Sequence, residues 1–116
     1  MNEEFEINEF LLKTLEPLGI PVYFTARKKA NLPVIVYNIT GENGYEFWED
    51  QETITRYKVC INIFSKGNYI EIKNNIKKLM LNAGFKKTDI PECQYDEDIE
   101  LYNQPMFFVF YKENLN

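Results

Sequence analysis

The chain has 116 residues, of which 45% are hydrophobic and 27% are charged. This length fits a single domain over residues 1–116, and this balance excludes a disordered or collagen-like chain. The formal net charge of −5 disfavours a protein that grips nucleic acid or an anionic membrane through a general basic field. No stretch approaches the ~20 apolar residues that span a bilayer, and the acidic first residues do not resemble a signal peptide. We therefore expect a cytoplasmic protein.

Residues 2–18 carry apolar side chains at spacings that suit one broad helical face. Asn2 or Asn8 is the expected cap of this helix, because a short polar side chain can accept hydrogen bonds from the first backbone N–H groups. Pro17 and Gly19 mark its end, because proline interrupts the helical bonding and glycine accepts the turn that follows. The sequence therefore predicts a first helix that ends before Gly19.

Three strand patterns follow this helix. A short strand is expected over residues 20–25, and residues 34–40 predict an inner strand because both of its faces are largely apolar. Residues 41–55 contain two glycines, a cluster of carboxylates and the only tryptophan, and they predict a long hairpin arm or loop. Residues 56–65 alternate again, which suits a strand paired antiparallel with the inner strand.

The strongest helical pattern spans residues 68–83. Asn68 is the expected N-terminal cap, with Glu71 three residues later as its capping-box partner. Gly84 is the expected left-handed residue after the helix, and Phe85 is expected to make the hydrophobic contact beyond it. Local sequence thus predicts both ends of this helix.

Residues 105–113 predict a final strand whose two faces are both apolar. One layer of helices covers only one face of a sheet, so the second face requires barrel closure or another subunit, which indicates assembly. We therefore expect an α+β chain in the order α-β-β-β-α-β, with two helices packed on a single mostly antiparallel sheet of about four strands. The alternating residues of the last strand are Met106, Phe108 and Phe110 against Phe107, Val109 and Tyr111.

Catalytic chemistry has few candidates in this sequence. The chain has no histidine, so a serine or cysteine nucleophile would lack its usual base. Ser65, the only serine, precedes the second helix and suits local backbone bonding. Cys60 falls in an apolar strand and Cys93 in a polar loop, which predicts a buried thiol and an incidental loop thiol. We expect no enzyme and no cofactor.

Two acidic runs each allow two interpretations. Several carboxylates close together can bind a divalent cation, but the run at residues 96–100 lacks the pattern of an EF-hand loop. Solvated loops are the preferred interpretation of both runs, and we expect no metal. The tryptophan within the other run is alternatively an interface anchor. The residues concerned are Asp96, Glu97, Asp98 and Glu100 in one run, and Glu46, Glu49, Asp50 and Glu52 around Trp48 in the other.

The stretch "GFKKTDIPECQYDEDIELYNQPMFFVFYKE" joins the end of a helix, an acidic tyrosine-bearing segment and an aromatic strand. This order resembles the carboxy-terminal pattern of small tail-completion proteins of long-tailed phages and prophages. The earlier "PVIVYNI" and "RYKVCINIFSKGNYIEI" are similar to the same family, in which a strand with tyrosine leads to an acidic hairpin and an arginine opens the next strand. The resemblance covers roughly residues 20–113.

This resemblance implies a tail terminator or a close relative, an α+β subunit that assembles into a ring, commonly a hexamer. Such a ring caps the tail tube and offers a surface to the head connector, without catalysis. The implied partners are further copies of the chain, the major tail tube protein and head-tail connector proteins, with no specific nucleic acid and no membrane. The implied location is the bacterial host cytoplasm during assembly and then the virion tail.

We expect the contacts of such a subunit on the hairpin over residues 41–52, with a tip folded back onto its own sheet as the alternative. The acidic segment offers second-choice contacts, for which a plain surface loop is the alternative. The candidates are Tyr45, Phe47 and Trp48 on the hairpin, and Asp96, Asp98 and Tyr102 in the acidic segment.

Two other functions stay open at this point. A monomeric regulatory module of a prophage or host would capture a basic protein on its acidic surface, and this binding would be sensitive to salt. A carboxylate-based metal enzyme would be stabilised by Mn²⁺ or Ca²⁺. Self-association distinguishes a ring subunit from the first, and a thermal melt with metal tests the second.

Overall fold

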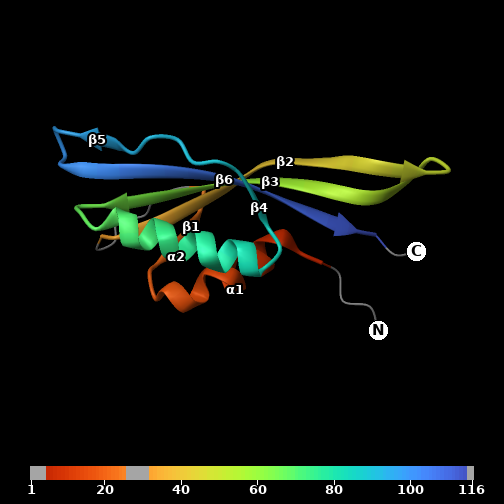
Figure 1. Ribbon diagram of the computed structural model, residues 1–116, viewed down its shortest axis with the longest axis horizontal. Helices are drawn as coiled ribbons and strands as arrows, with labels where there is room; N and C mark the ends of the chain where they lie inside the picture. The colour runs from red at the N-terminus through yellow and green to blue at the C-terminus, as the bar shows by residue number, and fades with distance from the viewer. Residues whose placement is uncertain (1–4, 26–31, 115–116) are drawn as a thin grey trace.

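The computed structural model describes residues 5–25 and 32–114. Within these residues, two α-helices and one mixed sheet of six strands form an α+β fold (Figure 1). The elements are α1 (Ile7–Leu15), the 3₁₀ helix η1 (Glu16–Leu18), β1 (Val22–Phe24), β2 (Val34–Trp48), β3 (Gln51–Ser65), α2 (Tyr69–Asn82), β4 (Lys86–Asp89), β5 (Gln94–Asp96) and β6 (Leu101–Glu113).

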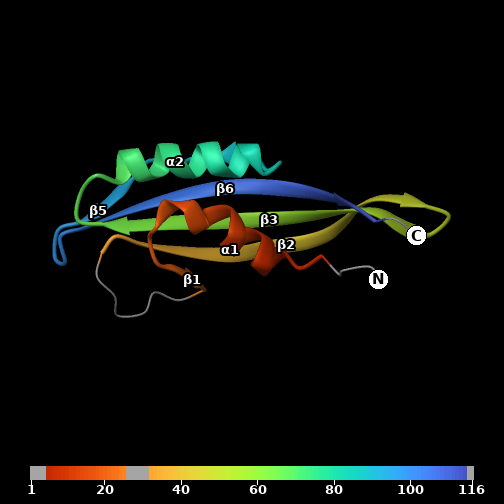
Figure 2. The same ribbon diagram turned by 90° about the horizontal axis from the view of Figure 1, so that it is seen from below.

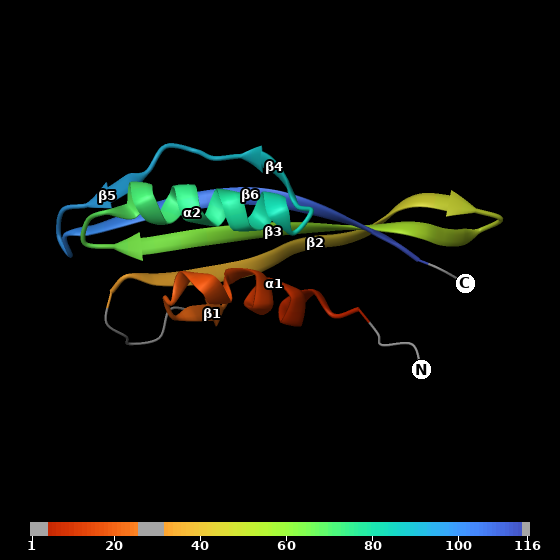
Figure 3. The ribbon, with the colours of Figure 1, turned by 60° about the horizontal axis from the view of Figure 1, so that its bottom comes forward.

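The sheet has the strand order β1-β2-β3-β6-β4, and β5 also pairs with β6. The long strands β2, β3 and β6 are antiparallel neighbours, whereas β1 runs parallel to β2, with Val22 opposite Ile35. Figure 3 shows β1 beside β2 at one border of the sheet and β4 and β5 beside β6 at the other. The predicted class, two helices and long-strand order are therefore confirmed.

The sheet has six strands rather than about four. The additional strands, β4 and β5, contain only "KKTD" and "QYD", and all of their residues are exposed. Such short polar segments carry no alternation of apolar and polar residues from which a strand can be predicted. Pairing with β6, which is distant from β4 in the sequence, gives them their extended conformation.

Both helices pack on the same face of the sheet (Figures 1 and 2). The core between the two layers joins Tyr37, Ile61 and Phe108 of the sheet to Leu11 of α1 and Ile76 of α2, and all five are at most 1% exposed. In the paired register, the core residues of β2, β3 and β6 lie opposite one another, because side chains on one face recur every second residue. The predicted alternation along the last strand is confirmed.

No described helix covers the second face of the sheet. Phe64, Pro105 and Phe107 are half-buried there, whereas Val34 and Val109 are buried. We call this surface, formed by the side chains of β2, β3 and β6 that point away from the helices, the open face. Phe107 and Val109 of the last strand are among the residues for which the sequence predicted a need for additional cover.

Glu6, rather than Asn8, caps α1. Its carboxylate accepts hydrogen bonds from the backbone N–H groups of Asn8 at 3.1 Å and Glu9 at 2.8 Å, and these bonds lower the pKa of Glu6 below 4.5. The prediction for Asn8 is wrong because its side chain accepts a 3.1 Å hydrogen bond from the hydroxyl of Tyr37 instead. Asn2 lies outside the described residues. Gly19, with a φ of 67°, closes the 3₁₀ turn that follows the helix.

The two predicted ends of α2 have different outcomes. Asn68 stands at the N-cap position as predicted, but the capping hydrogen bond expected of its side chain is missing, because its φ is 54° and a capping side chain needs an extended backbone. Its amide instead donates a 3.2 Å hydrogen bond to Glu71. The prediction for Gly84 is confirmed, since its φ is 100° and the N–H of Phe85 donates to the carbonyl of Met80 at 3.0 Å.

Candidate functional site

The most prominent surface feature is a hairpin arm formed by residues 41–58, the distal parts of β2 and β3. The ladder continues from the pair Gly41–Lys58 to the pair Trp48–Gln51, and the arm extends beyond both helices (Figure 1). Glu49 and Asp50 form a two-residue turn with φ values of 49° and 63°, as a type I′ hairpin requires. The predicted hairpin is therefore an arm of paired strands rather than an irregular loop.

The three aromatic candidates on the arm have different surroundings. Tyr45 is 55% exposed and contacts Tyr111, with ring centroids 4.7 Å apart. Phe47 is 61% exposed, but its ring lies over Gly44, because a Cβ added at Gly44 would be only 2.3 Å from the Cζ atom of Phe47. Trp48 is 71% exposed, and its indole makes no ring contact or hydrogen bond with the described residues. The arm therefore presents Trp48 most fully to a partner.

The acidic candidates lie at the opposite end of the molecule from the arm (Figure 1). Asp96 ends β5 and accepts a 3.0 Å hydrogen bond from the backbone N–H of Asp98, so the two residues shape one turn. Tyr102 of β6 is half-buried between Tyr69 and Tyr95, with centroid separations of 5.1 and 4.6 Å. The sequence candidates therefore form two separate groups, and the fold does not bring them together.

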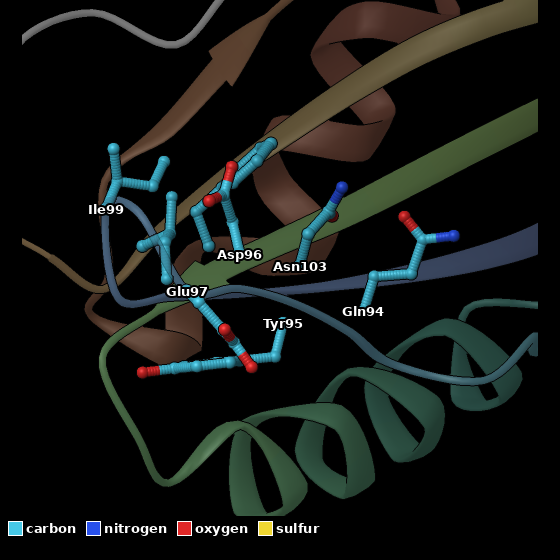
Figure 4. A pocket seen from close by; sticks show the side chains of 8 residues that line it. Gln94, Tyr95, Asp96, Glu97, Ile99 and Asn103 are labelled. Carbon is cyan, nitrogen blue, oxygen red and sulfur yellow. The ribbon is translucent and has the colours of Figure 1, made fainter.

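A pocket of about 460 Å³ lies beside this acidic turn. Figure 4 shows Gln94, Asp96 and Asn103 pointing to one side of the strands and Tyr95 pointing to the other. The Oδ1 atom of Asn103 is buried without a hydrogen-bond partner, and Asp96 and Glu97 make the rim acidic. The pocket therefore favours a group that donates hydrogen bonds or carries positive charge.

Arg56 and Lys58 are functional candidates that the sequence prediction missed. They border a second pocket, of about 350 Å³, on the open face at the base of the arm. The alternation of residues along β3 places Lys58 on the face away from the core, and this is the sequence feature from which it could have been identified. The bulges in β2 and β4, which bring the other walls of the pocket into position, have no signature in the sequence.

Within the described residues, neither thiol is activated as a nucleophile and the carboxylates form no cluster that could hold a metal ion. Both cysteines are free, and burial raises the pKa of the Cys60 thiol and of the Cys93 thiol. A raised pKa disfavours the thiolate, which is the nucleophilic form. Across residues 5–25 and 32–114, no group of three or more His, Cys, Asp or Glu side chains lies close enough together to hold a metal ion.

Comparison with known proteins returns no match, either to a protein-family model or to a curated protein. In the described part of the chain, no helix is long and apolar enough to cross a membrane. The arm, the open face and the two pockets are therefore the features of the molecule that bear on its function.

Proposed function

We propose that this chain is a structural subunit of a phage or prophage tail, a tail terminator that assembles into a ring, caps the tail tube and contributes to head-tail joining. The observation that carries the proposal is the arm, a paired hairpin beyond the core with a 71% exposed tryptophan near its tip. A folded monomer gains nothing from an indole in water, whereas a tryptophan buried at an interface contributes a large share of the binding free energy.

The open face supports the same proposal. A ring requires each subunit to use two different surfaces, one that donates a contact and one that accepts it. The arm and the open face are two such surfaces on one chain, and both contain aromatic side chains, which are enriched in protein interfaces. We propose that further copies, the major tail tube protein and the head-tail connector proteins bind at these surfaces.

The test is the molar mass of the protein in solution, measured by light scattering across a concentration series. The measurement is made on the protein alone and then with short tail tubes from the same gene cluster. A discrete ring mass, or self-association that occurs only on tubes, supports the terminator. The proposal is refuted if the protein is monomeric at every concentration and does not bind the tubes.

Replacing Trp48 with alanine is predicted to weaken this assembly by about 2 kcal/mol or more, as expected for an anchor residue at an interface. The monomer should keep its melting temperature, because Trp48 does not contribute to the core. Light scattering measures the first effect and circular dichroism the second. Leu81→Ala is the matched control, because Leu81 is a 50% exposed apolar residue on α2. An unchanged oligomer mass in the Trp48 variant would contradict the prediction.

A further inference from the structure

The pocket at the base of the arm is basic, although the chain as a whole is acidic. Two cations, Arg56 and Lys58, line it, and no carboxylate does. The remaining walls supply the hydroxyls of Thr40 and Thr88 and the apolar rings of Phe107 and Tyr111. We call this cavity the basic pocket. Its lining combines positive charge with aromatic surface.

The two cations have no partner among the described residues that would neutralise them. The Nε atom of Arg56 is buried without a hydrogen-bond partner, and the Arg56 guanidinium lies 5.6 Å from the ring centroid of Tyr45. Lys58 is exposed and forms no ion pair with the described residues. A buried donor without an acceptor is costly, so the basic pocket favours an anionic group that can accept from it.

The tip of the arm offers a matching set of groups. Glu49 and Asp50 at the turn form no hydrogen bond or ion pair with the described residues, and Trp48 is beside them. Glu46 and Glu52 accept hydrogen bonds from Thr53 and Thr55 within the arm, so they are less available to a partner. The tip thus combines free carboxylates with an exposed indole.

We propose that the basic pocket receives the arm tip of a second copy of this chain, with the Trp48 indole against Phe107 and Tyr111 and the carboxylates of Glu49 and Asp50 against Lys58 and Arg56. The charges are complementary, and a pocket of about 350 Å³ has room for a side chain and its neighbours. This inference rests on the self-association proposed above and names the surface that accepts the arm.

The tip that occupies the pocket comes from another copy because of the arm's own pairing. The ladder from Gly41–Lys58 to Trp48–Gln51 holds the tip at the far end of the two strands from the basic pocket. A chain therefore cannot place its own Trp48 against its own Lys58 without breaking the hairpin. The pocket beside β5 is a poor alternative acceptor, because Asp96 and Glu97 there would repel an acidic tip.

The test uses two variants of the full chain. Lys58→Glu reverses a charge in the basic pocket, and Trp48→Ala removes the indole from the tip. Each variant alone is expected to associate at least tenfold more weakly than the wild type. Their mixture is expected to recover one contact, because one chain keeps an intact pocket and the other an intact tip. Lys78→Glu, an exposed lysine on α2, is the control and should behave as the wild type does.

Light scattering, alone and on tail tubes, distinguishes the outcomes. Loss of self-association in both single variants, together with a heterodimer in their mixture, supports the inference. A wild-type mass of two chains at every concentration would then refute the ring but leave this contact intact. If the Lys58→Glu variant forms rings as the wild type does, the proposed contact is wrong but the ring is not. If Lys58→Glu abolishes only the binding of tubes, the occupant is the tube protein and the inference is again wrong. A wild type that never associates overturns both proposals.

Discussion

Tyr37 connects the first helix to the sheet. Its ring is 1% exposed in the core of β2, and its hydroxyl donates a 3.1 Å hydrogen bond to Oδ1 of Asn8 in α1. The Nδ2 group of Asn8 in turn donates a 2.8 Å bond to the carboxylate of Glu6, which caps the helix. A single chain of hydrogen bonds thus joins the start of α1 to an inner strand.

Replacing Tyr37 with phenylalanine is predicted to lower the free energy of unfolding by about 1 kcal/mol, because the ring still packs but the hydrogen bond is lost. Denaturant unfolding at neutral pH measures the change. Tyr57→Phe is the control, because Tyr57 packs on Phe5 and its hydroxyl makes no hydrogen bond with the described residues. Equal effects in the two variants would show that the bond to Asn8 contributes nothing.

The same residue predicts how stability changes at high pH. Burial, and secondarily the charge of Glu6, raises the pKa of Tyr37 above 10.0 in the folded state. The Tyr37 side chain therefore ionises first in the unfolded chain, so its contribution to stability is present below pH 10.0 and is lost as the pH rises through the folded pKa. The Tyr37→Phe variant should lose stability less steeply over this range than the wild type.

The C-terminus of α2 is the element whose end depends most on one residue. The N–H groups of Gly84 and Phe85 donate to the carbonyls of Leu81 and Met80 at 3.1 and 3.0 Å, which is the pair of bonds that closes a helix through a left-handed residue. Phe85 is 2% exposed and packs in the core with Met80. This end therefore positions both α2 and the chain that leads into β4.

Gly84→Ala is predicted to destabilise the fold by about 1–2 kcal/mol, because a side chain is disfavoured at a φ of 100°. The added Cβ would also lie 3.4 Å from the ring of Phe110. Thermal or denaturant unfolding measures the loss. Gly67→Ala is the matched control, since nothing lies within 4 Å of its added Cβ and its change should stay within about 0.5 kcal/mol. Similar losses at both glycines would contradict this account.

The elements that the sequence predicted correctly are those that carry their own pattern. The alternation along β3 and β6 and the helical stripe of α2 each mark the residues that face the core. Asn68 takes the predicted N-cap position without a capping hydrogen bond, because the preceding turn, in which the hydroxyl of Ser65 accepts a 3.1 Å bond from the N–H of Gly67, gives it a left-handed backbone. A capping signature therefore predicts a capping hydrogen bond only when the backbone of the N-cap residue is extended.

At the scale of the whole molecule, the extents of 54 × 29 × 23 Å describe an elongated body, with the arm at one end and the acidic turn at the other (Figure 1). Local composition predicted the arm, since glycines, carboxylates and a tryptophan gather in one short stretch. It did not predict the basic pocket, because β2, β3, β4 and β6 contribute its walls and only their pairing brings these together. A site whose residues come from several strands can be predicted only when the register of the strand pairing is known.

The whole-molecule prediction is that folding and assembly are separable. Replacing residues 45–54 with Asn-Gly between the paired residues Gly44 and Thr55 provides a type I′ turn and leaves every buried residue of the core cluster in place. The shortened chain should unfold cooperatively but no longer self-associate. Circular dichroism and light scattering measure the two properties. A shortened chain that does not fold would show that the arm belongs to the folding unit.

The position of the only tryptophan at the arm tip has a spectroscopic consequence. Its intrinsic fluorescence therefore reports on the arm tip alone. Heating the isolated protein should therefore change indole emission little, even as the sheet unfolds, because the indole is already in water. Burial of the tip against a partner should shift the emission to shorter wavelength, so the native protein carries an unlabelled probe of arm contacts.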